Sequence, residues 1–282
     1  MKKFLWVILC IPVGGSFAQQ LHITARGGFA GYQGDLQSKR ITLDQSSFAF
    51  GLGLKYDFTP HWSVRAEFNS GKIEADDKKN EPQLQLRNLS FQSKVVEGNL
   101  LAEYSLFDLT ERKITPYFFG GIALFHFNPY AYDTLGNKLY LKPLSTEGQG
   151  LPQYPNRKEY KLTQFAIPFG AGFRYRVAEN VTLGYELGLR KTFTDYLDDV
   201  STSYVDQFTL AQERGAKAVE MAFRGGELKN STAVYPPEGE VRGGSDFKDW
   251  YYFHGITVTV ALKSNGPSGG KKGSTNCPKP VL

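Results

Sequence analysis

Large apolar residues alternate with small or charged residues along much of this chain. The residues at every second position from 48 to 58 are large and apolar: Phe48, Phe50, Leu52, Leu54, Tyr56 and Phe58. The residues between them are small or charged: Ala49, Gly51, Gly53, Lys55 and Asp57. Successive residues of a β-strand point to opposite faces, so this segment predicts a strand with one apolar face. Such a strand is typical of a barrel wall with lipid outside and a narrow polar lumen inside, and its length suits a tilted membrane strand of about 9–11 residues.

The same alternation predicts eight strands, over residues 21–32, 48–58, 62–69, 88–107, 114–127, 159–177, 181–190 and 250–262. Both faces of the fifth are apolar, so the pattern does not assign its register. The connections after the second, fourth and sixth strands are short and the other four are long, which is typical of a bacterial outer-membrane barrel with its short turns in the periplasm. We therefore predict an all-β fold, an eight-stranded antiparallel transmembrane β-barrel over residues 19–262 with long outer loops and short periplasmic turns. The even strand count places both termini in the periplasm, and Trp250, Tyr251 and Tyr252 are expected in an aromatic girdle at the outer interface.

The predicted inner face carries most of the charge in the strands. Its charged residues are Arg26, Lys55, Asp57, Arg65, Glu67, Glu97, Glu103, Arg174, Arg176, Glu186 and Arg190. A soluble β-sandwich or a lipocalin-like barrel is the alternative, but it would place its apolar face inward, and these charges would be costly in a dry core. Because an eight-stranded barrel is just wide enough for side chains to fill it, we expect the cations and carboxylates to pair and plug the lumen.

The two ends of the chain differ from the body. Residues 1–18 read as a signal peptide, with Lys2 and Lys3 before a short apolar stretch and Ser16-Phe17-Ala18 as the cleavage site, so that Cys10 is removed. Residues 263–282 are predicted to form a flexible basic periplasmic tail. The candidate partner-binding residues of this tail are Lys263, Lys271, Lys272, Cys277 and Lys279. The formal charge of +5 lies largely at the two ends, so the near-neutral body gives no support for nucleic-acid binding.

Residues capable of chemistry are sparse. The four histidines are scattered without metal-ligand spacing, and no catalytic, metal or cofactor site is predicted. Asp195, Tyr196, Asp198 and Asp199 follow the seventh strand as an outer-loop motif of unknown role. Its carboxylates suit acid–base work or calcium binding, but such residues more often cap a turn or a following helix. Residues 205–223 predict a short helix over the barrel mouth, with Phe208, Ala211, Val219 and Ala222 on one face.

Several strings together resemble one known family. They are Arg87-Asn88-Leu89-Ser90-Phe91, Pro116-Tyr117-Phe118-Phe119-Gly120-Gly121, Phe127-Asn128-Pro129, Pro143-Leu144-Ser145-Thr146-Glu147-Gly148-Gln149-Gly150, Ala166-Ile167-Pro168-Phe169-Gly170, the segment from Thr192 to Thr202, and Cys277-Pro278-Lys279. This pattern resembles the PorG family of Bacteroidota outer-membrane barrels over nearly the whole mature chain. The resemblance implies a component of the type IX secretion system that associates with the periplasmic ring of PorK and PorN. The implied role is anchoring, without catalysis and without transport through the lumen.

The sequence therefore favours a structural outer-membrane subunit of the type IX protein secretion system, which contacts lipid and the PorK/PorN ring and has no small-molecule substrate. Two alternatives stay open. One is a surface-binding, adhesin-like barrel whose long loops hold a ligand. The other is a hydrolase at the rim of the barrel with Asp195, Asp198 and Asp199 as its acids.

Overall fold

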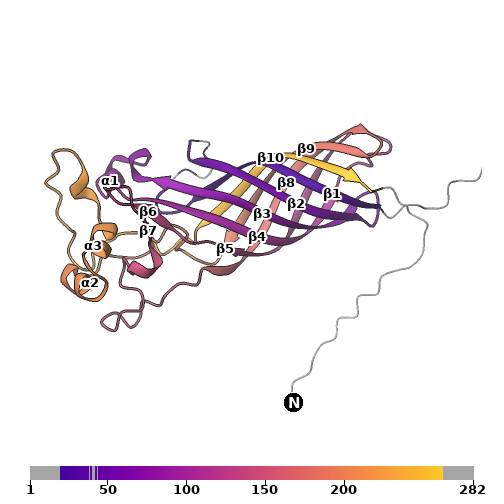
Figure 1. Ribbon diagram of the computed structural model, residues 1–282. Coiled ribbons are helices and arrows are strands. Elements are labelled where there is room, and N and C mark those ends of the chain that lie inside the picture. Colours follow the sequence, from indigo (N-terminus) through magenta and orange to yellow (C-terminus); the bar gives the residue numbers. More distant parts are fainter. Residues whose placement is uncertain (1–19, 38, 40–41, 43, 263–282) are drawn as a thin grey trace, which may run out of the picture.

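Eight long strands form the body of the molecule. The computed structural model describes residues 20–37, 39, 42 and 44–262 (Figure 1). The wall strands are β1 (Gln20–Gln33), β2 (Ser46–Asp57), β3 (Trp62–Asp76), β4 (Ser90–Ser105), β5 (Ile114–His126), β8 (Thr163–Ala178), β9 (Val181–Thr192) and β10 (Trp250–Ala261). Each pairs antiparallel with its neighbours in the order β3-β2-β1-β10-β9-β8-β5-β4, and a further pairing of β3 with β4 closes the sheet. The predicted eight-stranded antiparallel barrel is confirmed.

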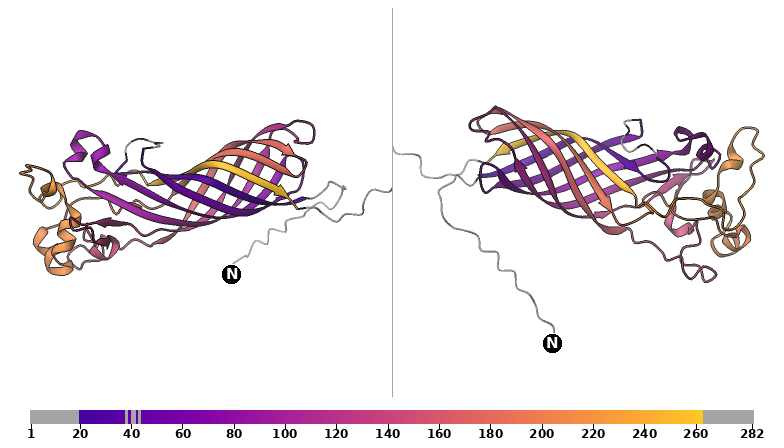
Figure 2. Two further views of the ribbon diagram at one scale, coloured as in Figure 1. Left: turned by 45° about the horizontal axis from the view of Figure 1, so that its top comes forward. Right: turned by 180° about the vertical axis from the view of Figure 1, so that it is seen from behind.

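The connections divide the barrel into two unlike ends. The turns at residues 58–61, 106–113 and 179–180 lie at one end, which we call the turn end (Figure 2). Gln20, which pairs with Asp57, and Leu262, whose backbone N bonds the oxygen of Leu21, lie at the same end. Four long connections lie at the opposite, loop end: loop 1 (34–45), loop 2 (77–89), loop 3 (127–162) and loop 4 (193–249). The predicted alternation of short and long connections is therefore confirmed.

The strand faces follow the predicted alternation. Phe48, Leu52 and Leu54 of β2 are more than half exposed on the outside, whereas Lys55 is buried inside. The structure also assigns the register of β5, where Phe118 and Ile122 face outward and Tyr117 and Phe119 face the lumen. A barrel that exposes its large apolar side chains and buries its charges is built to stand in lipid.

Two aromatic residues depart from the predicted girdle. Tyr251 faces the lumen and donates its hydroxyl hydrogen to Glu97 at 2.7 Å. Tyr252 lies on the other face, but loop 1 covers it, and its hydroxyl group bonds the backbone N and O of Thr42. The prediction was wrong for both, because position along a strand does not reveal which side chains the loops cover. Trp250 is half-buried and packs edge-to-face on Phe169.

The wall strands also run further toward the loop end than their apolar pattern indicates. The pattern of β3 breaks after Asn69, yet pairing with β4 continues to Asp76 opposite Ser90. Backbone hydrogen bonds do not depend on apolar side chains, so the polar outer part of the strand stays paired. In contrast, β8 begins at Thr163 and not at Glu159.

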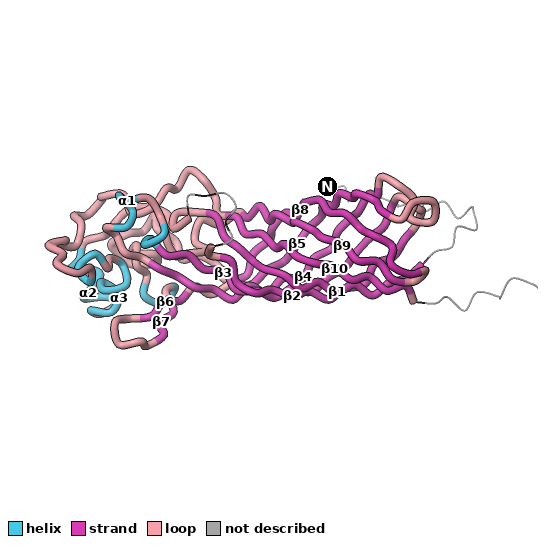
Figure 3. The backbone as a smooth tube through the Cα atoms, turned by 90° about the horizontal axis from the view of Figure 1, so that it is seen from above, coloured by secondary structure: helices cyan, strands magenta, loops and turns pink. Residues whose placement is uncertain are grey.

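Short elements and the loops form a layer over the loop end (Figure 3). They are η1 (Asp77–Lys79), α1 (Pro82–Gln85), the hairpin of β6 (Tyr130–Tyr132) and β7 (Lys138–Tyr140), η2 (Lys142–Leu144), α2 (Gln207–Arg214), α3 (Ala216–Ala222) and η3 (Gly225–Glu227). The predicted helix is thus two helices, divided at Gly215, whose φ of +85° suits glycine. The predicted buried face is only partly right, since Ala222 is buried but Phe208 is 81% exposed.

Some predictions fall on residues that the structure does not describe. The signal peptide (1–18) with Cys10, and the tail (263–282) with Lys263, Lys271, Lys272, Cys277 and Lys279, lie outside the described residues. Within the described residues, none of the helices has both the length and the apolar character needed to cross a membrane.

Candidate functional site

Four arginines and four glutamates are buried in the middle of the lumen. They are Arg26, Arg65, Arg174, Arg190, Glu67, Glu97, Glu103 and Glu186. Glu186 on β9 accepts hydrogen bonds from Arg26 at 2.6 Å, from Arg65 at 2.8 Å and from the Tyr117 hydroxyl group at 2.7 Å. Arg65 also contacts Glu103 at 2.9 Å, and Glu103 in turn accepts from Arg174. The network thus links strands on opposite sides of the barrel. The predicted ion-pair plug is confirmed for these eight residues, whereas Arg176 of the predicted set makes no ion pair among the described residues and reaches only a backbone oxygen.

A second centre lies nearer the loop end. Glu97 on β4 accepts from Arg190 at 3.0 and 3.1 Å and from the side-chain amides of Asn69 and Asn99. Glycines give these long side chains their room, since a Cβ atom on Gly188 would collide with Nη1 of Arg190. The chain therefore combines glycine with charge on its inner face for a steric reason.

Aromatic side chains fill the lumen between these ion pairs and the loop end. The ring of Phe253 faces the guanidinium groups of Arg26 and Arg190, whose Cζ atoms lie 5.3 and 4.6 Å from the ring centroid. Phe125 packs against Tyr251 at 5.1 Å and stacks on Phe127 at 5.6 Å. These rings belong to the main apolar cluster of the protein, which continues into the loop layer. The interior is therefore packed from its middle to the loop end.

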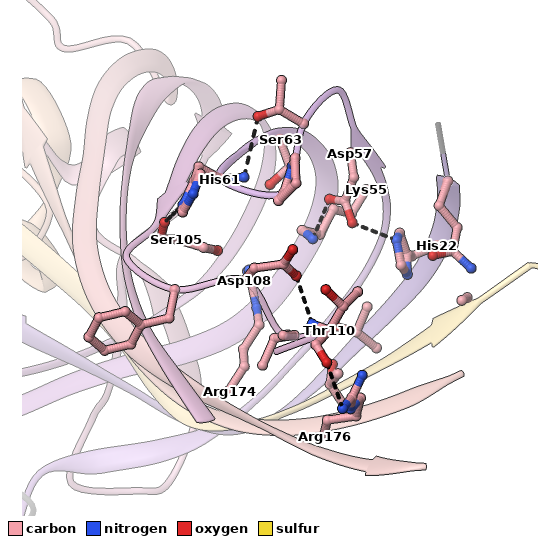
Figure 4. Close-up of a pocket in the computed structure, with 18 of the residues that line it drawn as sticks. His22, Lys55, Asp57, His61, Ser63, Ser105, Asp108, Thr110, Arg174 and Arg176 are labelled. Carbon is pink, nitrogen blue, oxygen red and sulfur yellow. Dashed lines mark hydrogen bonds and ion pairs between the residues drawn. The ribbon is translucent and has the colours of Figure 1, made fainter. Parts of the chain in front are cut away.

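The turn end holds a pocket of about 310 Å³ between the barrel wall and the turns (Figure 4). Asp57 lies on its wall between two bases, with Nζ of Lys55 at 2.5 Å and Nε2 of His22 at 2.8 Å. Arg176 reaches the backbone oxygen of Thr110 at 3.4 Å. Arg174 also lines the pocket and bonds Glu103, so the ion-pair network closes the pocket toward the middle of the barrel.

Two buried ion pairs hold the loops together. Glu147 of loop 3 accepts from the backbone N of Ser201 and of Thr202 at 3.0 Å each, and from Arg242 at 2.9 Å. Arg242 of loop 4 also donates to the backbone oxygens of Asp199 and Ala222. This Glu147–Arg242 pair joins loops 3 and 4 beneath the surface.

Arg87 makes the corresponding connection for loops 1 and 2. Its guanidinium group binds both carboxylate oxygens of Asp77 at 2.8 Å. It also donates to the backbone oxygen of Asp35 in loop 1 at 2.9 Å and to that of Arg242 in loop 4 at 2.5 Å. Together, Arg87 and Arg242 join all four loops.

The outer-loop motif also lies inside this layer. Asp195, Asp198 and Asp199 are at most 3% exposed, and Tyr196 stacks on Tyr160 at 4.9 Å. Asp199 accepts from the hydroxyl groups of Thr146 at 2.5 Å and Tyr160 at 2.7 Å. The three carboxylates therefore act as hydrogen-bond acceptors within the loops and do not line an open cleft. Within the described chain, no group of three or more acidic, histidine or cysteine residues is arranged to hold a metal ion.

A buried acidic cluster lies where loop 4 meets the wall. Tyr32 donates its hydroxyl hydrogen to Asp198 at 2.5 Å, and Asp249 lies 3.3 Å from the same oxygen. Burial raises the pKa of Asp198 and of Asp249 well above the usual range, and burial raises the pKa of Asp35 and of Asp199 to about 6. Protonation of these four carboxyl groups therefore stabilises the folded arrangement of the loops around them.

The sequence identified only part of this arrangement. It singled out Asp195, Asp198 and Asp199, and the strings with Arg87 and Glu147 supported the resemblance to the PorG family. It missed Arg242, Asp77 and Asp249, which lie in polar loops without periodicity. A basic residue followed by glycines, as in Arg242-Gly243-Gly244, is so common in sequences that this pattern could not identify Arg242 as the partner of Glu147.

Comparisons with known proteins give a family and distant structural likenesses. Neisserial surface protein A is 11% identical with a TM-score of 0.42, and the alignment covers 86% of this chain and 97% of that chain. The attachment invasion locus protein Ail of Yersinia pestis is 9% identical with a TM-score of 0.39, over 86% of this chain and 99% of that one. A major outer membrane protein from Thermus thermophilus is 14% identical with a TM-score of 0.42, over 87% and 100%. No curated protein matches this chain. A family model described as "Domain of unknown function (DUF6089)" matches residues 2–216, and the chain belongs to that family.

Proposed function

We propose that this protein is a structural subunit of the outer membrane that anchors a periplasmic assembly, and that the assembly is the PorK/PorN-like ring of a type IX secretion system. The observation that carries the proposal is the packed lumen, in which the ion pairs around Glu186 and Glu97 lie beneath an aromatic cluster. A barrel packed in this way has no wide aqueous channel for a folded or extended substrate. Its function then lies in what its two ends bind.

The orientation follows from the connections. Short turns in outer-membrane barrels lie in the periplasm and long loops lie outside. In this orientation the turn-end pocket and Leu262, the last described residue before the tail, face the periplasm, where a ring would bind. The resemblance to the PorG family supports the identity of that ring, and the basic tail residues are the proposed contacts.

Affinity purification from gently solubilised membranes tests the anchor. The tag is inserted at the tip of the β6–β7 hairpin, beside Leu135, which is 81% exposed, so both chain ends stay free. We expect PorK- and PorN-like proteins to co-purify, and to be lost when residues 263–282 are deleted. The last wall strand ends at Ala261, so this deletion leaves the barrel complete.

A barrel recovered alone, under conditions that preserve the ring, would contradict the proposal. Undiminished protein secretion in a clean deletion strain would contradict the type IX assignment even if another periplasmic partner were found.

The loop layer supports a second candidate function, binding at the cell surface. It is tied by buried ion pairs, yet Phe208 and Phe247 are 81% and 85% exposed on it. If it is a binding surface, changing both to serine abolishes binding to the surface ligand and leaves secretion intact. Under the anchoring function, the same double variant secretes normally and retains the ring.

A further inference from the structure

Outward-facing lysines gather at one edge of the apolar wall. Lys72 on β3, Lys94 on β4 and Lys191 on β9 each stand on the outer face, on the loop-end side of the apolar part of their strand. Below them, the outward positions are apolar or small, with Phe68 on β3, Leu100 on β4 and Leu189 on β9. We call these three lysines the lysine rim.

The distance of the lysine rim from the turn end matches the thickness of a membrane. Lys72 lies ten residues from Trp62, Lys94 ten residues from Tyr104, and Lys191 ten residues from Val181. At about 3.3 Å per residue and a tilt of roughly 40°, ten residues span about 25 Å along the barrel axis. That is the height of the apolar band of a membrane barrel, so the lysines stand at the level of one row of headgroups.

The turn-end edge of the apolar band differs from the lysine rim in the kind of residue that faces outward. Outward positions there are aromatic or aliphatic, including Trp62, Tyr104 and Tyr175, and within the described strands none is charged. Lysines that merely extend to any interface would occur at both edges. The asymmetry indicates that the loop end meets a more anionic leaflet than the turn end does.

The pairing of the rim lysines also favours an anion. Lys72 and Lys94 are direct cross-strand partners, and like charges in that position destabilise a sheet. Glu74 binds Lys72 at 2.8 Å, but the ion pairs of the described residues include neither Lys94 nor Lys191. Lys191 pairs in register with Trp250, and the exposed ring of Phe193 follows two residues later. A cation beside aromatic rings at the edge of a lipid-facing wall suits an amphiphile with a charged headgroup.

We propose that the lysine rim binds the phosphate groups of phosphorylated lipids in the leaflet at the loop end. This inference rests on the proposed orientation of the barrel, with the loop end outside. The occupant is a lipid because the rim is continuous with the lipid-facing wall. Its phosphate groups supply the negative charge that the ion pairs of the described residues do not provide for Lys94 and Lys191.

The test uses the full chain, folded in nanodiscs of phosphatidylcholine to which bisphosphorylated lipid A is added. Native mass spectrometry after release into detergent measures the lipid A that each barrel retains. Each juxtamembrane lysine strengthens the binding of an anionic lipid about fivefold. We therefore expect the triple variant, Lys72→Gln with Lys94→Gln and Lys191→Gln, to retain at least tenfold less lipid A than the wild type. The matched control, Lys78→Gln with Lys158→Gln and Lys229→Gln, removes the same charge from exposed loop positions and changes retention less than twofold.

Four further measurements distinguish the possible outcomes. Replacing the three rim lysines with arginine preserves retention, and heat-dependent mobility on gels checks that every variant is folded. Lipid A without phosphates is not retained by the wild-type barrel. Inorganic phosphate added in excess does not displace the lipid; displacement would show that a free anion, and not a lipid, is the ligand.

Equal loss in the rim and control variants would reduce the effect to net charge and overturn the proposal. So would full retention by the rim variant. The same rim variant is expected to co-purify with the periplasmic ring as the wild type does. Failure of ring binding in the wild type would instead contradict the anchoring function and leave the lipid result standing.

Discussion

Individual charged residues, buried in ion pairs, hold the loop end of this protein together. Arg242 is 3% exposed and binds Glu147 at 2.9 Å, together with two backbone oxygens from loop 4. Removing one partner of a buried pair leaves an unpaired charge, which costs about 3–5 kcal/mol, whereas an exposed pair contributes at most about 1 kcal/mol. Residues of equal formal charge thus differ widely in what they do for stability.

Glu147→Gln tests this at the loop end. The substitution leaves Arg242 without its carboxylate, and we expect the loop layer to lose about 3 kcal/mol of local stability. Limited trypsin digestion measures it: loop 4 is cut much faster, while the barrel keeps its heat-dependent mobility on gels. Glu159→Gln is the control, because its pair with Lys142 is exposed and its loss changes cleavage little. Equal cleavage in the two variants would refute the role of Glu147.

Glu186→Gln tests the lumen. Arg26 and Arg65 lose the carboxylate that both contact, and we expect thermal unfolding of the barrel at a clearly lower temperature, from a cost of about 3 kcal/mol or more. Circular dichroism in detergent follows the transition. Glu179→Gln in the exposed turn between β8 and β9 is the control and leaves the transition unchanged. An unchanged transition for Glu186→Gln would mean that the network only fills space.

At the scale of elements, the strands and the loops obey different rules. The wall strands follow a period of two, and in β3 and β4 backbone hydrogen bonds continue the pairing beyond the point where that pattern breaks. The loops have no period, and they are fixed by side chains that meet from distant parts of the chain, such as Arg87 with Asp77 and with loop 4.

The loop layer is expected to depend on pH. Burial raises the pKa of Asp35 and of Asp199 to about 6, above the value near 4 of an unfolded chain, and burial also raises that of Asp198. The folded loops bind these protons more tightly than the unfolded loops do. Their contribution to stability is therefore complete below about pH 4 and is lost as the pH rises through about 6.

Hydrogen exchange at the backbone amides of Val200, Ser201 and Thr202 measures this effect. After correction for intrinsic rates, we expect the local opening free energy at pH 8 to be about 2 kcal/mol lower than at pH 5. Asp199→Asn does not titrate and makes the difference smaller. An opening free energy that rises with pH would contradict the prediction.

At the scale of the whole molecule, the barrel has a filled lumen, and its loop end and turn end are the two surfaces that can bind other molecules. Its middle is held by arginine–glutamate pairs, its loop end by aromatic packing and tied loops, and the turn end carries the pocket of about 310 Å³ around Asp57. This arrangement favours contact at the ends over passage through the centre.

Ion conductance tests the closed lumen. Purified barrels in planar lipid bilayers are expected to show no conductance above leak, because Arg65, Glu103 and Glu186 fill the cross-section. A general diffusion porin, inserted under the same conditions, confirms that the bilayers report open channels. Regular conductance steps from the wild-type protein would contradict a closed lumen and the anchoring function that rests on it.

The strands could be predicted because lipid and lumen impose opposite demands on alternate residues, and β9 shows this with Leu183, Tyr185 and Leu187 outside and Glu186 inside. Tyr251 and Tyr252 could not be placed, since one is covered by the lumen network and the other by loop 1. The acids of the outer-loop motif were visible as a motif, but their burial depends on Tyr32, Thr146 and Tyr160, which are remote in sequence.

The sequence by itself determined the eight-stranded barrel, the side of the wall that faces lipid, and the alternation of short turns and long loops. These features depend on local periodicity, which each strand carries in its own residues. Only the tertiary structure decided which charges pair and how the loops are tied by Arg87 and Arg242. It alone also showed that Lys72 stands beside Lys94. Those contacts join residues far apart along the chain, and their energies depend on burial that no local pattern reports.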